Sequence, residues 1–378
     1  MRAPGPAHRA AAIAMHEPTR RHFLHTVLAL PASTRFSSAL EKRVRTVAGN
    51  GTAGSSQDGV DGRHAPVNNP YGVVFGPDGA LYFCEVDTGR IRRFDLKSRR
   101  VTTVAGNGQK SYAGDGGAAP AASLNAPHEI RFDANGNLYA VERDSHVVRR
   151  IDARTNVIST VAGTGSPGFS GDGGPAARAE LRMPHSIAFD AGGNLLICDI
   201  GNSRIRSVNV KTGTITTFAG TGERGSTPDE SPLEGTPLNG PRSIDTDEEG
   251  NVYLVLREGN AVFRIDRRLR RLARIAGTGE TGFSGDGGPA VAARLNGPKG
   301  IAYGRNRGLY VVDTENHAIR RVDLKTGSIA TVLGTGRRGD GPDGDPLRCT
   351  MARPHGVCFH AGALYVTDSE NHRIRVLA

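Results

Sequence analysis

Short apolar runs separated by turn residues recur along the chain from residue 43 onwards. The unit that opens at Pro70 shows the pattern: an apolar run over 71–75, a Gly-containing turn, a second run over 81–86, a polar loop, and two further runs. Four short runs bounded by turn residues are typical of a four-stranded antiparallel sheet. The pattern therefore predicts small sheets joined by tight turns.

The unit repeats six times. The prolines that open the units are spaced by 57 residues, and by 56 for the last: Pro70, Pro127, Pro184, Pro241, Pro298 and Pro354. The same step separates one glycine in each unit: Gly49, Gly106, Gly163, Gly220, Gly277 and Gly334. It also separates one aspartate in each unit: Asp58, Asp115, Asp172, Asp229, Asp286 and Asp343. One four-stranded sheet cannot bury both of its faces, so the repeat predicts an all-β fold, a six-bladed β-propeller of four-stranded antiparallel blades.

The two ends of the repeat complement each other. The last unit stops at its third strand, HRIRVLA at 372–378, while residues 44–47 align with fourth strands such as 101–104. We therefore expect the N-terminal strand to complete the last blade, which removes an exposed sheet edge. The predicted domains are a leader over 1–39 and a propeller over 40–378.

Two segments carry a family resemblance. LYVVDTENHAIRRVD at 309–323 and LYVTDSENHRIRVL at 364–377 resemble the NHL repeat, and all six units share the pattern. The chain thus resembles NHL-repeat six-bladed propellers, of a bacterial exported type. That family includes protein-binding and RNA-binding modules, kinase sensor domains, and relatives with lyase or lactonase activity, so the resemblance leaves the function open.

The leader has a different composition. Thr19-Arg20-Arg21-His22-Phe23-Leu24 precedes an apolar run over 26–32, which resembles a twin-arginine export signal. This predicts a periplasmic or secreted protein; the alternative is a disordered tail on a cytoplasmic one. No stretch approaches the roughly 20 apolar residues that span a bilayer, so no transmembrane segment is predicted.

Composition changes this picture little. The 51 glycines and 21 prolines suit tight turns, and the absence of tryptophan with only 5% aromatic residues predicts no nucleic-acid binding. The four cysteines lack zinc-site spacing and are expected to be buried small residues, with only Cys349 and Cys358 near enough in sequence to suggest a bridge. A monomer is expected.

A Gly-rich insert precedes each unit, most regularly at 163–181 and 277–295. Its Asp-Gly-Gly-Pro-Ala segment predicts a capped short helix, with the aspartate bonded to backbone donors. Phosphate or calcium binding by the loop is the alternative.

Two sets of polar positions should meet at one mouth of the central channel, because the first strand of a blade begins where the second ends. The residues after the blade prolines are Tyr71, His128, His185, Arg242, Lys299 and His355. The residues that close the second strands are Glu85, Glu142, Asp199, Leu256, Asp313 and Asp368. The candidate ligand-binding residues are Tyr71, Arg242, Lys299, Glu85, Glu142, Asp199, Asp313 and Asp368. As an alternative for the acids, we expect bonds to turn backbone or to arginine.

Three histidines at the mouth, His128, His185 and His355, are candidate metal ligands, since converging imidazoles commonly hold catalytic zinc. Segment 183–205 resembles the histidine-bearing blades of the propeller lyase that cleaves peptidyl-α-hydroxyglycine, and that resemblance implies zinc; lactonase-like propellers instead hold calcium. We expect His355 to lie three blades from both other histidines. The alternative is that the histidines line the channel and bond to neighbours or water.

Blade four departs from the pattern, with Arg242 and Arg257 near the mouth. Its outer hairpin carries the arginines Arg264, Arg267, Arg268, Arg270, Arg271 and Arg274, expected toward the opposite face. This strip predicts a solvated basic edge, or a site for phosphate, nucleic acid or anionic lipid.

Two functions follow. The favoured hypothesis is a noncatalytic module whose channel face binds a protein, a peptide or a small anionic ligand. The alternative is a metal-dependent lyase or hydrolase at the channel mouth, with Glu142 or Asp199 as base.

Overall fold

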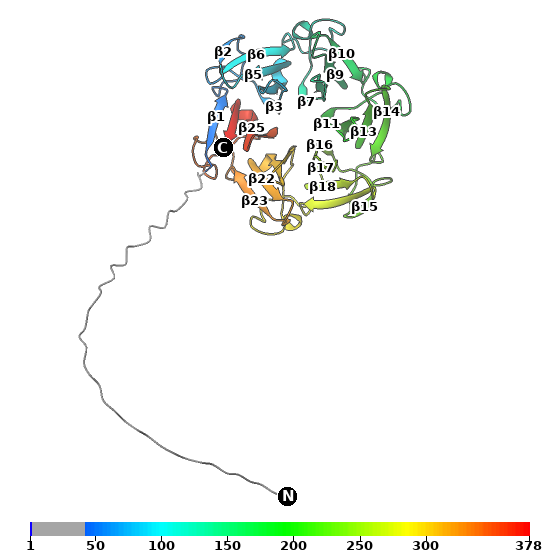
Figure 1. Cartoon of the computed structure of the whole chain (residues 1–378), viewed down its shortest axis with the longest axis vertical. Helices are drawn as coiled ribbons and strands as arrows, with labels where there is room; N and C mark the ends of the chain where they lie inside the picture. Colours follow the sequence, from blue (N-terminus) through cyan, green and yellow to red (C-terminus); the bar gives the residue numbers. More distant parts are fainter. Residues whose placement is uncertain (2–41) are drawn as a thin grey trace, which may run out of the picture. The chain divides into compact units, whose positions relative to one another are not determined.

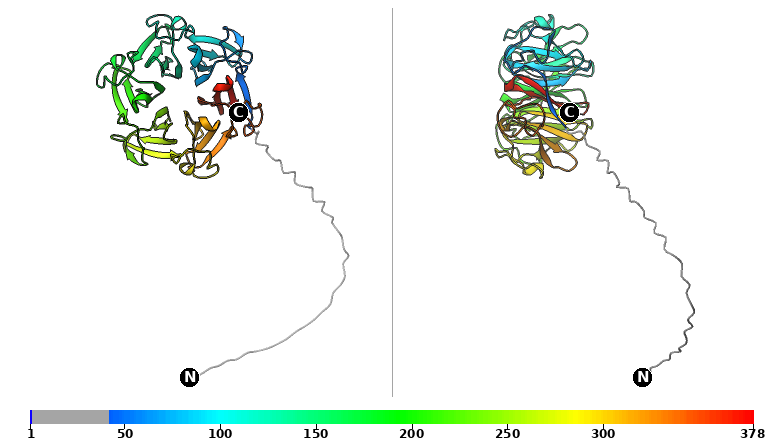
Figure 2. Two further views of the ribbon diagram at one scale, coloured as in Figure 1. Left: turned by 180° about the vertical axis from the view of Figure 1, so that it is seen from behind. Right: turned by 90° about the vertical axis from the view of Figure 1, so that its left-hand side faces the viewer.

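The computed structural model describes Met1 and residues 42–378, so the predicted export signal lies outside the described part. Within residues 42–378 the strands form six antiparallel sheets arranged around a central axis (Figure 1). Figure 2 shows the same ring of blades from behind and edge-on. The predicted all-β six-bladed propeller is confirmed.

The strands of each blade follow one another outward from the channel. Blade one contains β3 Pro70–Phe75, β4 Leu81–Glu85, β5 Arg90–Phe94, β6 Arg100–Ala105 and the short outer β2 Val60–Asp61. Blade two contains β7 Pro127–Phe132, β8 Leu138–Glu142, β9 Val147–Ile151 and β10 Ile158–Ala162. Blade three contains β11 Pro184–Phe189, β12 Leu195–Asp199, β13 Arg204–Asn209 and β14 Thr214–Ala219.

The second half of the ring repeats this order. Blade four contains β16 Pro241–Thr246, β17 Val252–Leu256, β18 Ala261–Asp266, β19 Arg271–Ala276 and the short outer β15 Ser231–Pro232. Blade five contains β20 Gly300–Gly304, β21 Gly308–Asp313, β22 Ala318–Asp323 and β23 Ile329–Leu333. Blade six contains β24 Val357–His360, β25 Ala363–Asp368, β26 Arg373–Leu377 and β1 Val44–Ala48.

The N-terminal strand closes the ring as predicted. Strand β1 pairs antiparallel with β26, with Val44 opposite Leu377, so blade six takes its outer strand from the start of the chain. In Figure 1 the blue β1 lies beside the C-terminus. The exposed edge that β26 would otherwise leave is thereby covered.

The apolar core lies between the blades. Val141 on β8 and Ile187 on β11 belong to one buried cluster that joins blades two and three, and similar clusters join the other neighbours. Each sheet therefore buries its faces only against adjacent sheets, as the repeat predicts.

The 57-residue glycine marker has a steric cause. Gly163 has a φ of 94°, and a Cβ there would lie 2.3 Å from the carbonyl oxygen of His146. Only glycine fits such a backbone at such a close approach.

The predicted short helices form, but each is a single 3₁₀ turn. The turns before the blade prolines are η2 Ala119–Ala121, η3 Ala176–Arg178 and η5 Ala290–Ala292. Further 3₁₀ turns follow the second strands at η1 Val86–Thr88, η4 Ile200–Asn202, η6 Thr314–Asn316 and η7 Ser369–Asn371. The predicted side-chain cap is wrong for η3, whose cap position is Pro175 with no side-chain bond; the loop aspartate Asp172 binds Thr217 and Arg206 instead.

All four cysteines are free, and Cys349 and Cys358 form no bridge. In the part of the chain that the structure describes, no helix has the length and apolar character needed to cross a membrane.

Candidate functional site at the channel mouth

The six residues that follow the blade prolines gather at one end of the channel. The strand register places Pro70 opposite Glu85 and Pro184 opposite Asp199, so first strands begin where second strands end. The ring of Tyr71 stacks on His355, with 3.8 Å between ring centroids. We call this set the mouth ring: Tyr71, His128, His185, Arg242, Lys299 and His355.

Contacts continue around the mouth ring from blade to blade. The edge of Tyr71 meets His128 with 4.6 Å between ring centroids, and His128 lies at the same centroid distance from His185. The Nη2 of Arg242 lies 3.2 Å from Nε2 of His128. The expectation that His355 lies three blades from His128 is wrong: blade six adjoins blade one, so only Tyr71 separates the two imidazoles.

The three imidazoles are buried and uncharged. Burial, with Arg242 next in effect, lowers the pKa of His128 and of His185 well below the ordinary value. Burial and then Lys299 do the same to the pKa of His355. The mouth ring therefore offers neutral hydrogen-bonding groups at pH 7, while its positive charge lies on Arg242 and Lys299.

The two cations differ in what balances them. Lys299 Nζ donates to Glu315 Oε1 at 2.6 Å, and burial still lowers the pKa of Lys299 to about 8. Arg242 is only 4% exposed, and among residues 42–378 no carboxylate lies within 4.0 Å of it. Burial lowers the pKa of Arg242 to about 10, which leaves it charged at pH 7. Arg242 is thus a buried cation whose direct side-chain partner is a neutral histidine.

The five acids that close the second strands lie inside the blades and face arginines. Each of the acids is fully buried. The pairs are Glu85–Arg92, Glu142–Arg149, Asp199–Arg206, Asp313–Arg320 and Asp368–Arg375. The acids also accept bonds from backbone just before the first strand of their own blade, as Asp199 does from Arg182 N at 2.7 Å. This location supports the structural alternative for the acids and does not bring them together with the mouth ring.

The mouth histidines do not fit a shared zinc site in this arrangement. His185 Nδ1 contacts Met183 O at 2.7 Å, His355 Nδ1 contacts Ser369 Oγ at 3.0 Å, and His128 Nε2 faces Arg242. No group of three His, Cys, Asp or Glu suited to a metal ion occurs in the described residues. The acids that close the second strands do not fit calcium either, because each lies inside its own blade against a buried arginine.

Further charged residues lie on the first strands of blades two and four, and they are not among the residues predicted from the sequence. Glu129 and Arg131 follow His128 on β7 and are joined by a 2.5 Å ion pair. Asp245 on β16 accepts a bond from Tyr303 N at 2.8 Å. The negative charges of Glu129 and, to a smaller extent, Asp245 raise the pKa of Arg131. Their signal was present in the sequence, since blade two reads PHEIRF where blade one reads PYGVVF.

Three of the six arginines of the blade-four hairpin face carboxylates. Arg267 contacts Asp190 at 3.2 Å, Arg271 lies 4.0 Å from Glu230, and Arg270 pairs with Glu234. Arg274 lies apart from these three arginines. Its Nη1 donates to Thr278 O near the channel-mouth face. These ion pairs support a solvated basic edge.

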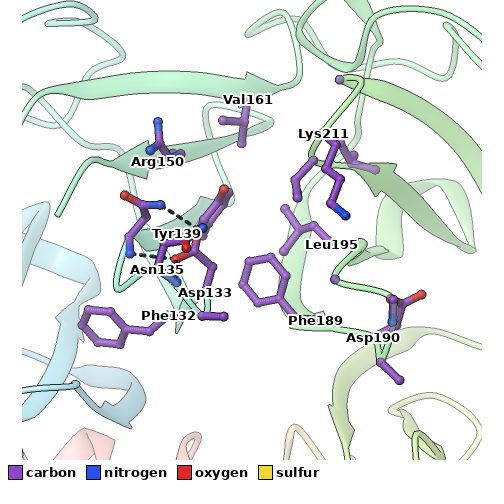
Figure 3. A pocket seen from close by; sticks show the side chains of 18 residues that line it. Phe132, Asp133, Asn135, Tyr139, Arg150, Val161, Phe189, Asp190, Leu195 and Lys211 are labelled. Atoms are coloured by element: carbon purple, nitrogen blue, oxygen red, sulfur yellow. Dashed lines mark hydrogen bonds between the residues drawn. The ribbon is translucent and has the colours of Figure 1, made fainter. Parts of the chain in front are cut away.

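A separate groove of about 820 Å³ lies between blades two and three (Figure 3). Tyr139 and Phe132 line one side of it, and Phe189 and Leu195 the other. Its two cations are Arg150, which is paired with Asp152 at 2.7 Å, and Lys211, which is exposed to solvent. The groove therefore lacks a buried cation without a counter-charge of the kind found at the mouth ring.

Two models of known protein families match the C-terminal part of the chain. The NHL repeat model matches residues 351–377, and the teneurin NHL domain model matches residues 270–353. This chain belongs to the NHL-repeat propeller family. The six blades closed by β1 make up residues 42–378, and the two family models together match residues 270–377 of them.

Relatives of this NHL propeller are longer proteins. NHL repeat-containing protein 2 from Bos taurus is 27% identical over 320 residues, which cover 75% of this chain and 44% of the relative. The chain thus spans less than half the length of this relative.

Solved structures share the fold at low identity. An auxiliary nutrient binding protein from Bacteroides ovatus has a TM-score of 0.66 and 17% identity, with 89% of this chain and 76% of that chain covered. A streptogramin B lyase has a TM-score of 0.52 and 15% identity, with 89% and 98% covered. At these identities the likeness concerns the fold alone.

Proposed function

We propose that this NHL propeller is a noncatalytic binding module whose channel mouth holds a small anionic ligand. The observation that carries the proposal is Arg242, a buried guanidinium with no carboxylate partner in the described part of the chain. A buried unpaired cation is costly, and an anionic group beside it would remove that cost. A guanidinium favours a planar carboxylate or a phosphate, which it can hold through two parallel bonds.

The surroundings of Arg242 favour the same sign of ligand. Arg143 and Arg257 are close enough to depress the pKa of His185, and Arg353 acts likewise on His355. The nearby carboxylate Glu315 is already bound by Lys299 and Arg353. The mouth therefore presents a positive field in which the Arg242 guanidinium can still donate to an anion.

The close packing of the mouth ring limits what can enter. Tyr71 stacks on His355, and His128 lies close to His185, so any acidic group that reaches Arg242 must be small. The imidazoles and the Tyr71 hydroxyl can bond to polar groups attached to that acid. The acid can belong to a free small molecule, a peptide or a protein partner, and we favour the small molecule. The nutrient-binding relative in fold supports a binding role, and the predicted leader would place that role in the periplasm.

Calorimetric titration of the full chain with acetate and with inorganic phosphate tests the proposal. We expect binding of at least one anion, and a loss of about tenfold or more in affinity for Arg242→Met, because a charge-assisted pair is removed. Arg271→Met is the control, since Arg271 is exposed on the outer strand β19 of the same blade. Equal affinity of Arg242→Met and the unaltered protein would contradict the proposal.

The second candidate is a metal-dependent lyase or hydrolase, favoured by the proximity of the neutral His128 and His185. Metal analysis of the chain from residue 40, purified without chelator or affinity histidines, separates the two candidates. About one transition-metal ion per chain, lost in His185→Ala, would favour the enzyme. A metal-free protein that binds anions would favour the binding module.

A further inference from the structure

Blade four replaces one shared contact of the propeller. In blade three, Asp199 closes the second strand, Arg206 lies on the third, and Thr217 lies opposite Arg206 on the fourth. The corresponding residues of blade four are Leu256, Phe263 and Arg274, with Phe263 opposite Arg274. The other four blades keep an acid, an arginine and a threonine at these positions: Glu85, Arg92, Thr103; Glu142, Arg149, Thr160; Asp313, Arg320, Thr331; and Asp368, Arg375, Thr46.

The replacement leaves a cavity. In blade three the fully buried Arg206 extends to Asp172 at 2.7 Å and to Ser170 O at 3.0 Å, and so fills the space beneath the insert. Phe263 is shorter and makes no such contacts. A cavity of about 260 Å³ lies at this place in blade four, with Leu256, Phe263 and Ala261 among its apolar lining.

Arg274 lines the cavity with an unbalanced charge. Its Nη1 donates to Thr278 O at 3.2 Å, and its Nε is buried without a hydrogen-bond partner. Among the residues that the structure describes, no carboxylate lies within 4.0 Å of this guanidinium. The insert aspartate Asp229, equivalent to the Asp172 that pairs with Arg206, accepts a bond from the backbone N of Arg274 at 2.7 Å and leaves the side chain unpaired.

The remaining charge in the cavity limits the ligand. Glu258 also lines the cavity, and its carboxylate lies 3.3 Å from Arg257. One free cation beside one engaged carboxylate suits a ligand with a single negative charge. A volume below that of drug-sized pockets suits a small molecule.

We propose that this blade-four cavity binds a small organic monocarboxylate, with the carboxylate paired to Arg274 and the apolar body resting on Phe263 and Leu256. The site is separate from the mouth ring and does not depend on Arg242. The carboxylate of the ligand takes the place of the acid that the other blades carry, and its apolar body displaces water from the apolar side chains of the cavity.

Calorimetric titration of the full chain with benzoate tests the site. The variant Arg274→Thr installs the residue that the other five blades carry, and we expect it to weaken benzoate binding by about tenfold or more. The double variant L256D/F263R restores the pair of the other blades and fills the cavity while Arg274 remains. It should also lose benzoate binding.

One control locates the effect. Arg271→Thr changes an exposed arginine on the same strand and should keep the benzoate affinity. Because Arg274→Thr leaves Arg242 unchanged, a loss of benzoate binding in that variant belongs to this cavity and not to the mouth ring. Equal benzoate affinity in Arg274→Thr, or no binding by the folded unaltered protein up to about 10 mM, would overturn the proposal.

Discussion

Arg242 is a buried cation for which the proposed ligand would supply the missing counter-charge. The guanidinium is buried and contacts His128, without a carboxylate in the described residues. Ligand sites often carry such unfavourable groups, because the ligand relieves them. The residue after the blade proline was predictable as a candidate from its spacing, but its lack of a counter-charge depends on which side chains surround it in space.

A stability measurement checks this view of Arg242. We expect Arg242→Met to raise the free energy of unfolding by about 1–3 kcal/mol in buffer without added carboxylate or phosphate, since an apolar side chain replaces a buried charge. Chemical denaturation measures the change. A decrease in stability of similar size would show that the bond to His128 outweighs the burial of the charge.

The mouth histidines should make stability depend on pH. Burial lowers the pKa of His185 in the folded protein, so the unfolded chain binds the proton more tightly. This contribution is complete above the unfolded pKa of about 6.5 and is lost as the pH falls below it, by about 1.4 kcal/mol per pH unit. The groups that act on His185 are the nearby Arg242, Arg143 and Arg257.

The contribution of His185 is measured as a difference in unfolding free energy between two proteins. Burial raises the pKa of Asp199 to about 6, so protonation of this acid works in the opposite direction as the pH falls. Comparison of the unaltered protein with His185→Leu isolates the histidine. Between pH 7 and pH 5 the unaltered protein should lose about 2 kcal/mol of unfolding free energy relative to the variant. Parallel pH profiles would mean that folding does not change the pKa of His185.

At the scale of the element, the acid that closes each second strand serves its own blade. Asp199 accepts bonds from Arg182 N and from the Asn202 amide, and faces the buried Arg206. The sequence placed these acids correctly at the strand ends, but it could not decide whether their oxygens face the channel or the third strand. The acid oxygens face the third strand because that strand carries a buried arginine, and a buried cation requires a nearby anion.

Blade four supplies the design for a test of this pair. Asp199→Leu leaves Arg206 without its buried acid, and we expect a loss of about 3–5 kcal/mol in unfolding free energy. The double variant D199L/R206F copies the Leu256–Phe263 pair of blade four, and it should recover most of that loss. Thermal or chemical denaturation of the single and double variants gives the coupling energy. A double variant as unstable as D199L would show that the apolar pair works only within blade four.

At the scale of the whole molecule, closure of the ring depends on β1. Val44 and Ala48 are fully buried, and Val44 pairs with Leu377 of the last strand. A chain that begins at Gly49 should lose at least about 3 kcal/mol of unfolding free energy from lost apolar burial and exposed pairing groups. Gel filtration should also show self-association through the uncovered edge of β26.

A chain that begins at residue 40 is the control, because it keeps β1 and removes only the predicted leader. It should match the full propeller in thermal unfolding and remain unassociated. Equal stability of the chain that begins at Gly49 would mean that blade six holds together with three strands.

The sequence by itself determined the number of blades, their strand order, the closure by β1 and the positions that face the channel mouth. It could do so because a repeated unit must bury its faces against copies of itself, so the period alone specifies the architecture. Only the tertiary structure decided which charges are balanced. It put the five acids against buried arginines, set Tyr71 between His128 and His355, and left Arg242 and Arg274 unpaired. Charge balance depends on distances of a few ångströms between residues that lie far apart in the sequence, and no periodicity encodes those distances.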